Sequence, residues 1–269
     1  MAVLRKLLKY DLRANIKIFL FIWPAIIAFA FLERLVIGAE LNDLLSTMLI
    51  ALTSTLFVLA VVAACVFAFI ICVIRFYSGL LRREGYLMFT LPVKPWQLLV
   101  SKFLTALLTI TVTLLLSVAA VLILFSGIDG FWRGMQEVLA QIGAFLGVMP
   151  CILMGLLVLS SISVNILRIY FVCCLGHLCR RARIFFSILF YYMINVLSQF
   201  ISIAAMIILS IGIDNNWFDL NAVEALVEKV SPGEAVSLLL GILLLLNLAV
   251  GAVYYLVSER ILRKRLNLE

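Results

Sequence analysis

The residues with the clearest capacity for metal chemistry lie in segment 170–183, which holds the single histidine of the chain. Cys173 and His177 are four residues apart, which puts them on one face of a helix, and both types are common zinc ligands. Cys174 and Cys179 point to other faces of a continuous helix, and no second histidine or carboxylate is near. The pattern therefore favours a cluster of reduced cysteines, and we expect no metal.

Other catalytic patterns are equally weak. Intramembrane proteolysis needs a metal-binding His–carboxylate set, an Asp pair or a Ser–His couple, and the apolar segments offer none of these. No GxxxxGK[ST] phosphate-binding loop occurs in the sequence. We therefore expect that the chain is not an enzyme, binds no cofactor of its own, and takes any nucleotide energy from another polypeptide.

Composition predicts an all-α, polytopic membrane protein. Hydrophobic residues make up 66% of the 269 residues and charged residues only 13%, whereas about a quarter of a soluble domain is charged. Several apolar runs are longer than the about 20 residues that a spanning helix needs. The expected spans are residues 16–37, 44–74, 96–125, 138–174, 184–213 and 235–257.

The amino-terminal residues 1–15 predict an interfacial helix. Val3, Leu4, Leu7 and Leu8 recur at helical spacing among basic residues, so one side could enter the lipid while the other meets anionic headgroups. The same residues could equally serve as a basic flank of the first span.

The distribution of basic residues predicts the orientation. Intervals 1–17, 75–102, 168–183 and 258–269 hold 18 of the 21 Lys and Arg residues. By the positive-inside rule these intervals and both termini are cytoplasmic. The net charge of +7 then reflects a positive inner face, and nucleic acid is not an expected partner. The outer interval 214–234 could form an amphipathic helix that enters the membrane or a solvated loop helix.

The cytoplasmic interval 77–95 contains several glycine and proline residues, which end or bend helices. Gly85 suits a helix C-terminus, Pro92 and Pro95 break regular structure, and Pro95 fits the first turn of a new helix. We expect a bend, a short helix over residues 86–91, a second bend and then the third span. Such a loop would let a partner push on the two spans that it joins.

Uncharged polar residues cluster in the later spans. Asn195, Gln199 and Ser202 share one face and either bond to neighbouring helices or line a polar passage. Charged groups are nearly absent from the spans, since Glu33 and Arg34 are expected to reach the interface. This absence argues against a transporter driven by ions.

A stripe of small residues marks the fourth expected span at strict four-residue spacing. Another helix could approach closely there, within the protomer or between protomers, and Pro150 should kink the same region. The stripe consists of Gly143, Gly147, Cys151 and Gly155.

The interval between the second and third spans resembles the cytoplasmic loop of ABC-2 type permeases, the membrane subunits of ABC exporters. The resemblance is carried by Glu84-Gly85, by Thr90-Leu91-Pro92-Val93, and by Leu98 and Ser101-Lys102. The number of spans, the termini and the amino-terminal helix also match. Tyr86 departs from the family, where a threonine often follows the glycine.

The resemblance implies a multi-pass protein of the bacterial cytoplasmic membrane that pairs with a second permease copy or a paralogue. It also implies two cytoplasmic ATPase subunits, which hold ATP and Mg²⁺, and a coupling helix seated in a groove of the ATPase. The second and fifth spans would line the path. The coupling residues would be Glu84, Gly85, Tyr86, Phe89, Leu91 and Pro92.

The expected function is export of an amphipathic or hydrophobic substrate such as a peptide, drug or lipid. The alternative is a non-transporting immunity or scaffold protein that binds a peptide or another membrane protein. An ABC ATPase gene beside that of the chain would favour the first.

Overall fold

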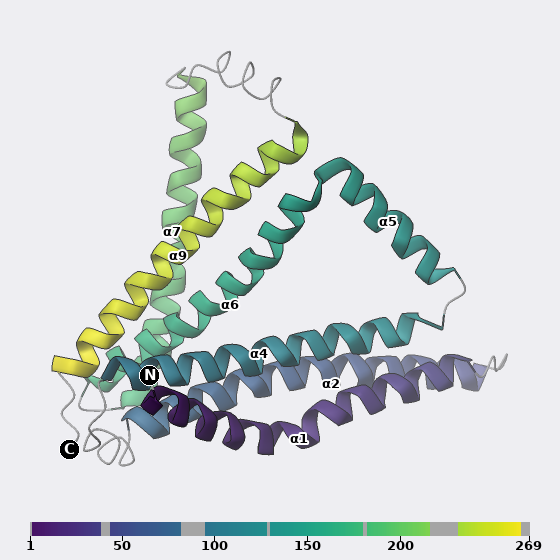
Figure 1. Ribbon diagram of the computed structural model, residues 1–269, viewed down its shortest axis with the longest axis horizontal. Helices are drawn as coiled ribbons and strands as arrows, with labels where there is room; N and C mark the ends of the chain where they lie inside the picture. The colour runs from purple at the N-terminus through teal and green to yellow at the C-terminus, as the bar shows by residue number, and fades with distance from the viewer. Residues whose placement is uncertain are drawn as a thin grey trace. The chain divides into compact units, whose positions relative to one another are not determined.

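The computed structural model describes residues 2–38, 44–81, 95–127, 130–179, 182–215 and 231–264. No strand occurs among these residues, which confirms the all-α class. The elements, labelled in Figure 1, are α1 (Ala2–Gly38), α2 (Leu44–Phe76), the π-helix η1 (Tyr77–Leu81), α4 (Pro95–Phe125), α5 (Phe131–Leu146), α6 (Val148–His177), α7 (Arg183–Asp214) and α9 (Pro232–Lys264).

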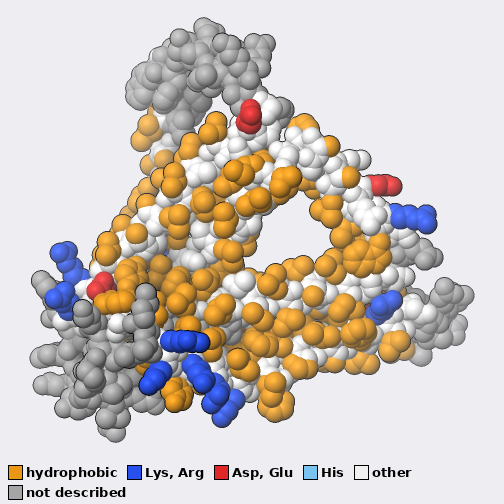
Figure 2. Space-filling model, viewed as in Figure 1, with side chains coloured by type: hydrophobic (Ala, Val, Ile, Leu, Met, Phe, Trp, Pro, Cys, Tyr) orange, Lys and Arg blue, Asp and Glu red, His pale blue; other side chains and the backbone are white. Residues whose placement is uncertain are grey.

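In the described part of the chain, six helices are long and apolar enough to cross a membrane: α1, α2, α4, α6, α7 and α9. A helix of 30 residues extends for about 45 Å, whereas the hydrocarbon of a bilayer is about 30 Å thick. Hydrophobic side chains cover these helices along their length (Figure 2), and many, such as Phe21 and Met206, are largely exposed. This exposure fits helices that are solvated by lipid.

Helix contacts divide the chain into two compact units, residues 1–138 and 139–267. In the first unit, α1, α2 and α4 pack side by side (Figure 1). Ile26 and Ala30 of α1 meet Phe57 of α2 and Ala120 of α4 in a buried cluster. The small alanines let the helix backbones approach closely, which is how helices associate without a hydrophobic driving force in lipid.

A row of five buried hydroxyl residues, the hydroxyl ladder, runs along α4. It consists of Ser101, Thr105, Thr109, Thr113 and Ser117. From Thr105 onward each hydroxyl donates to the carbonyl four residues earlier, at 2.7–2.9 Å. The side chains of α1 use the ladder as acceptors: Asn15 Nδ2 donates to Thr109 Oγ1 at 3.0 Å and Trp23 Nε1 to Thr113 Oγ1 at 3.1 Å.

In the second unit, α6 packs against both α7 and α9. A Cβ on Gly251 of α9 would lie 3.2 Å from Val164 of α6, and the rings of Phe171 and Tyr254 are 5.4 Å apart. On the other side, Gly176 near the end of α6 lies against Ser187 of α7. Most of the buried residues of α6 lie in its carboxy-terminal half.

The structure differs from the prediction at the fourth span, where two helices replace one. The helix is interrupted at Gly147, whose φ of 81° lies in the left-handed region that favours glycine. Pro150 does not kink a long helix; it occupies the first turn of α6, where its missing N–H is tolerated. The preceding helix, α5, has only 16 residues, about 24 Å, which is too short to span the hydrocarbon.

The amino-terminal residues belong to a longer helix, and the interfacial position expected for residues 1–15 stays a prediction. Helix α1 runs without a break from Ala2 to Gly38. Asn15 is 4% exposed and Phe19 is fully buried, so this part of α1 packs against its neighbours as part of the bundle.

The sixth span begins at Pro232, three residues before its expected start. Ser231 Oγ accepts from the backbone N–H of Glu234 at 3.4 Å, and Glu234 Oε2 accepts from the N–H of Ser231 at 3.2 Å. This capping box, with proline at the first helical position, is a strong helix start. The amphipathic helix considered for interval 214–234 falls largely outside the described residues.

Candidate functional site

The six expected coupling residues, Glu84, Gly85, Tyr86, Phe89, Leu91 and Pro92, lie outside the described residues. The helix ends that flank them are described. Helix α2 continues into η1, which ends at Leu81, and α4 begins at Pro95. The prediction that Pro95 lies in the first turn of a new helix is therefore confirmed.

An ion pair ties the start of α4 to α1. Lys102 Nζ lies 2.5 Å from Asp11 Oδ1, and Ser101 Oγ donates to Asp11 Oδ2 at 2.9 Å. The side chains of Lys102 and Asp11 are only 12% and 17% exposed. Both carboxylate oxygens of Asp11 are thus engaged by the two residues that close the sequence motif of the loop.

The end of α2 is held by α1 at nearly the same level. Arg75 Nη2 donates to the backbone carbonyl of Ala14 at 2.7 Å. In η1, Gly79 faces the side chain of Lys102, to which a Cβ at that position would approach within 3.4 Å. We call Asp11, Ala14, Arg75, Ser101 and Lys102 the loop base, because these residues join α1 to both helix ends that flank the loop.

The three polar residues expected on one face of the fifth span have different environments. Asn195 Oδ1 accepts from Arg168 Nη1 of α6 at 2.7 Å. Gln199 and Ser202 are exposed, and the hydroxyl of Ser202 donates to the carbonyl of Ser198 within the same helix at 2.9 Å. Interhelical bonding is therefore seen for Asn195, and a passage-lining role remains a prediction for Gln199 and Ser202.

Replacing Asn195 with Leu should lower the free energy of unfolding by about 2 kcal/mol, because a hydrogen bond to a charged group is lost beside a guanidinium. Gln199→Leu, one turn further along α7, is the matched control and should leave stability unchanged. Thermal unfolding of the purified protein in detergent measures both. If Gln199→Leu destabilises the protein as much as Asn195→Leu, the conclusion that Asn195 bonds between helices and Gln199 does not is wrong.

The predicted packing stripe does not form one surface. Gly147 interrupts the helix, so Gly143 belongs to α5 while Cys151 and Gly155 belong to α6. A Cβ at Gly143 or Gly155 would meet nothing within 4 Å, and Cys151 is exposed. Among the described residues no helix of the same chain packs on these positions; packing against a second protomer remains a prediction.

Glu33, near the end of α1, is enclosed by the helices of the first unit. Its side chain is 2% exposed in the first unit, and Ser54 Oγ of α2 donates to Glu33 Oε1 at 2.5 Å. Arg34, its neighbour, lies beside Gly127 at the end of α4. The carboxylate is thus buried between α1 and α2. The sequence of α1 alone does not indicate this burial, because the hydrogen-bond partner lies in α2.

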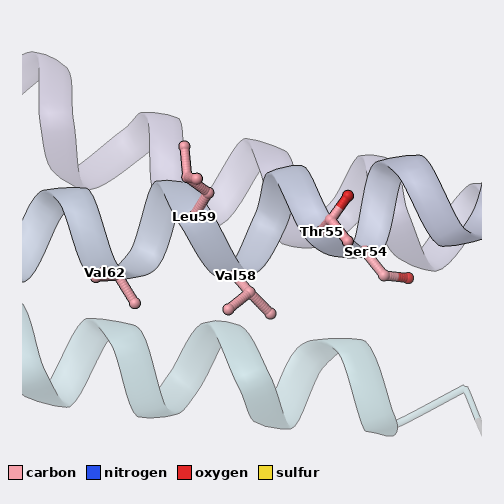
Figure 3. A pocket seen from close by; sticks show the side chains of 5 residues that line it. All are labelled: Ser54, Thr55, Val58, Leu59 and Val62. Atoms are coloured by element: carbon pink, nitrogen blue, oxygen red, sulfur yellow. The ribbon is translucent and has the colours of Figure 1, made fainter.

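A shallow depression of about 440 Å³ follows the exposed side of α2. Its lining side chains all project from α2, with α4 running alongside (Figure 3). They are Ser54, Thr55, Val58, Leu59 and Val62. This mostly aliphatic surface is chemically compatible with lipid or another apolar segment, and it lies on the span that the resemblance assigns to the path.

Three features of this structure were missed in the sequence. The hydroxyl ladder was detectable, since five Ser or Thr residues recur every four positions. Arg168 was assigned to a cytoplasmic interval, although it lies nine residues before the end of α6. The pairing of Asp11 with Lys102 had no local signal, because 91 positions separate the two residues.

Cysteine and histidine do not assemble into a metal site in the part of the chain that the structure describes. All six cysteines are free thiols there. No protein-family model, no curated protein and no solved structure matches this chain.

Proposed function

We propose that the chain is the permease subunit of an ABC exporter, driven by separate ATPase subunits that dock on the 77–95 loop. Both termini and this loop would face the cytoplasm of a bacterial cell. A second permease, identical or paralogous, would complete the passage. The substrate class that best suits an apolar surface with few charges is an amphipathic peptide, lipid or drug.

The observation that carries this proposal is the loop base. Ser101 and Lys102, which end the motif that resembles ABC-2 permeases, both bind Asp11 of α1. Arg75, which precedes the loop, binds the backbone of the same helix. A force applied to the loop would therefore act on α1, α2 and α4 together, and would tilt three spans as one body.

The distribution of charge also supports the proposal. Eighteen basic residues gather in four intervals, which include the loop and both ends of the chain, as the positive-inside rule requires of a cytoplasmic face. Tyr86 and Phe89 are large apolar residues within this polar interval. In a cytoplasmic loop such residues need a partner or the membrane surface to cover them.

The test replaces Tyr86 and Phe89 together with Ser in the tagged, full-length protein, purified from its native host in mild detergent. The parental protein should retain an ABC ATPase, identified by mass spectrometry, and vanadate-sensitive ATP hydrolysis. The double variant should lose at least about nine-tenths of both, because the docking surface is removed.

Tyr10→Ser, an exposed aromatic on α1 outside the loop, is the control and should retain the ATPase. Cysteines introduced at Ser78 and, separately, at Asn42 establish the side of the membrane in intact cells. An impermeant maleimide should label only the second. If the parental protein retains no ATPase, or the double variant retains as much as the parent, the alternative of a non-transporting scaffold is the better interpretation.

A further inference from the structure

The second unit contains a cation within a spanning helix. Arg168 lies nine residues before the end of α6 at His177, inside the segment long and apolar enough to cross the membrane. Its guanidinium donates to Asn195 Oδ1 at 2.7 Å and to Asn165 Oδ1, and its centre lies 5.4 Å from the ring centroid of Tyr191. Every one of these partners is electrically neutral.

No carboxylate is among the partners of the guanidinium in the described part of the chain. A guanidinium has five N–H donors. One on each terminal nitrogen is bound to an asparagine, and Nε is enclosed without a partner. One N–H on each terminal nitrogen is left, and such charged donors bind the oxygens of a carboxylate or phosphate strongly.

The asparagines are fixed in the orientation that the arginine needs. Asn165 Nδ2 donates to the carbonyl of Ser161 at 2.9 Å, and Asn195 Nδ2 donates to the carbonyl of Tyr191 at 2.9 Å. In each amide, therefore, the nitrogen donates to a carbonyl of its own helix and the oxygen accepts from Arg168. The guanidinium is held in one position before any ligand arrives, which lowers the entropic cost of binding.

The depth of Arg168 indicates which ligand it meets. Helix α6 has 30 residues, so a hydrocarbon layer of about 30 Å centred on it leaves about 7 Å of helix at each end. The Cα of Arg168 is then about 6 Å below the edge of the hydrocarbon. Its bonds to Asn165, one turn farther from this end of α6, and to Asn195 keep the guanidinium at that depth or deeper, where local thinning of the bilayer brings a headgroup to a fixed charge. Tyr192, on the neighbouring helix and 64% exposed, is a residue type enriched at this level.

We propose that Arg168, held by Asn165 and Asn195, binds the phosphate group of an anionic phospholipid in the leaflet at the carboxy-terminal end of α6. An anionic lipid supplies two phosphate oxygens to the two free N–H groups and cancels the uncompensated charge. A zwitterionic lipid brings its own cation and leaves the net charge in place. Arg168 is only partly buried, so part of its side chain is open to the surroundings of the second unit.

The full-length protein is purified in detergent and titrated with dioleoyl-phosphatidylglycerol or dioleoyl-phosphatidylcholine. Bound lipid is counted by native mass spectrometry and stabilisation is followed by thermal unfolding. The parental protein should prefer phosphatidylglycerol. Arg168→Gln should bind it at least about fivefold more weakly, the effect expected for one basic residue at an anionic headgroup, and should lose the difference in stabilisation between the two lipids.

Arg260→Gln removes an exposed arginine of α9 and is the matched control, which should keep the preference. Arg168→Lys keeps the charge without the paired donors and should fall between the parent and Arg168→Gln, so it tests the proposal even if the Gln variant does not fold. Equal losses in Arg168→Gln and Arg260→Gln, or an Arg168→Lys variant indistinguishable from the parent, would overturn the site. Stabilisation by inorganic phosphate in place of the lipid would show a soluble anion as the ligand and overturn the assignment to phospholipid.

Discussion

Replacing Asp11 with Leu is expected to lower the free energy of unfolding by about 3 kcal/mol, because it removes the carboxylate from beside a nearly buried ammonium group. Lys102 loses its carboxylate at 2.5 Å, Ser101 loses its acceptor, and both positions are almost enclosed. Unfolding of the purified protein, followed by circular dichroism during titration with sodium dodecyl sulfate, measures the change.

The double variant Asp11→Leu/Lys102→Met distinguishes the contribution of the ion pair to stability from that of side-chain packing. Removing both charges takes away the nearly buried ammonium group together with its carboxylate, so the double variant should be more stable than Asp11→Leu alone. Glu137→Gln, which changes an exposed carboxylate on α5, should have no effect. If Asp11→Leu is as stable as the parent, the pair does not hold α1 to α4. If the exporter proposal is right, Asp11→Leu should also reduce transport per ATP hydrolysed.

Replacing Gly176 with Ala should be nearly as damaging, with a net loss of about 2 kcal/mol. The new Cβ would lie 2.8 Å from both the backbone nitrogen and the Cβ of Ser187, closer than such atoms approach. Because the obstacle includes backbone, α6 and α7 must move apart, and this overpacking exceeds the gain of about 1 kcal/mol that alanine brings to a helix.

Gly155→Ala in the same helix is the matched control. A Cβ there meets nothing within 4 Å, so this variant should be as stable as the parent or more stable by up to about 1 kcal/mol. Thermal unfolding compares the pair directly, and a stable Gly176→Ala variant would contradict the close approach of α6 and α7. A lower dimer fraction in Gly155→Ala, measured by size-exclusion chromatography with light scattering, would indicate that a second protomer packs at Gly155.

The sequence predicts the helices well because hydrophobic run length is a strong and local signal. The start of α2 at Leu44 and of α4 at Pro95 follow from it and from the position of proline. The break at Gly147 does not, since apolar residues directly precede and follow it and one backbone dihedral angle decides it.

The candidate site was less predictable because its residues depend on partners in other helices. Glu33 lies near the end of an expected span, and its sequence position does not show that Ser54 of another helix donates a hydrogen bond to it. Asn195 is one of three similar polar residues, and only the position of Arg168 distinguishes it from Gln199. Burial and pairing of this kind are tertiary properties, which spacing along one helix does not contain.

The hydroxyl ladder has a consequence for how α1 and α4 can move. Its rungs repeat every four residues and are chemically equivalent, so a slide by one helical turn would give Asn15 and Trp23 new hydroxyl acceptors of the same kind. The polar contacts along the ladder therefore permit neighbouring registers, about 6 Å apart, whereas Asp11 has one ammonium partner at Lys102. The hydroxyl ladder thus allows α1 and α4 to slide between several registers, and the ion pair at the loop base selects one of them.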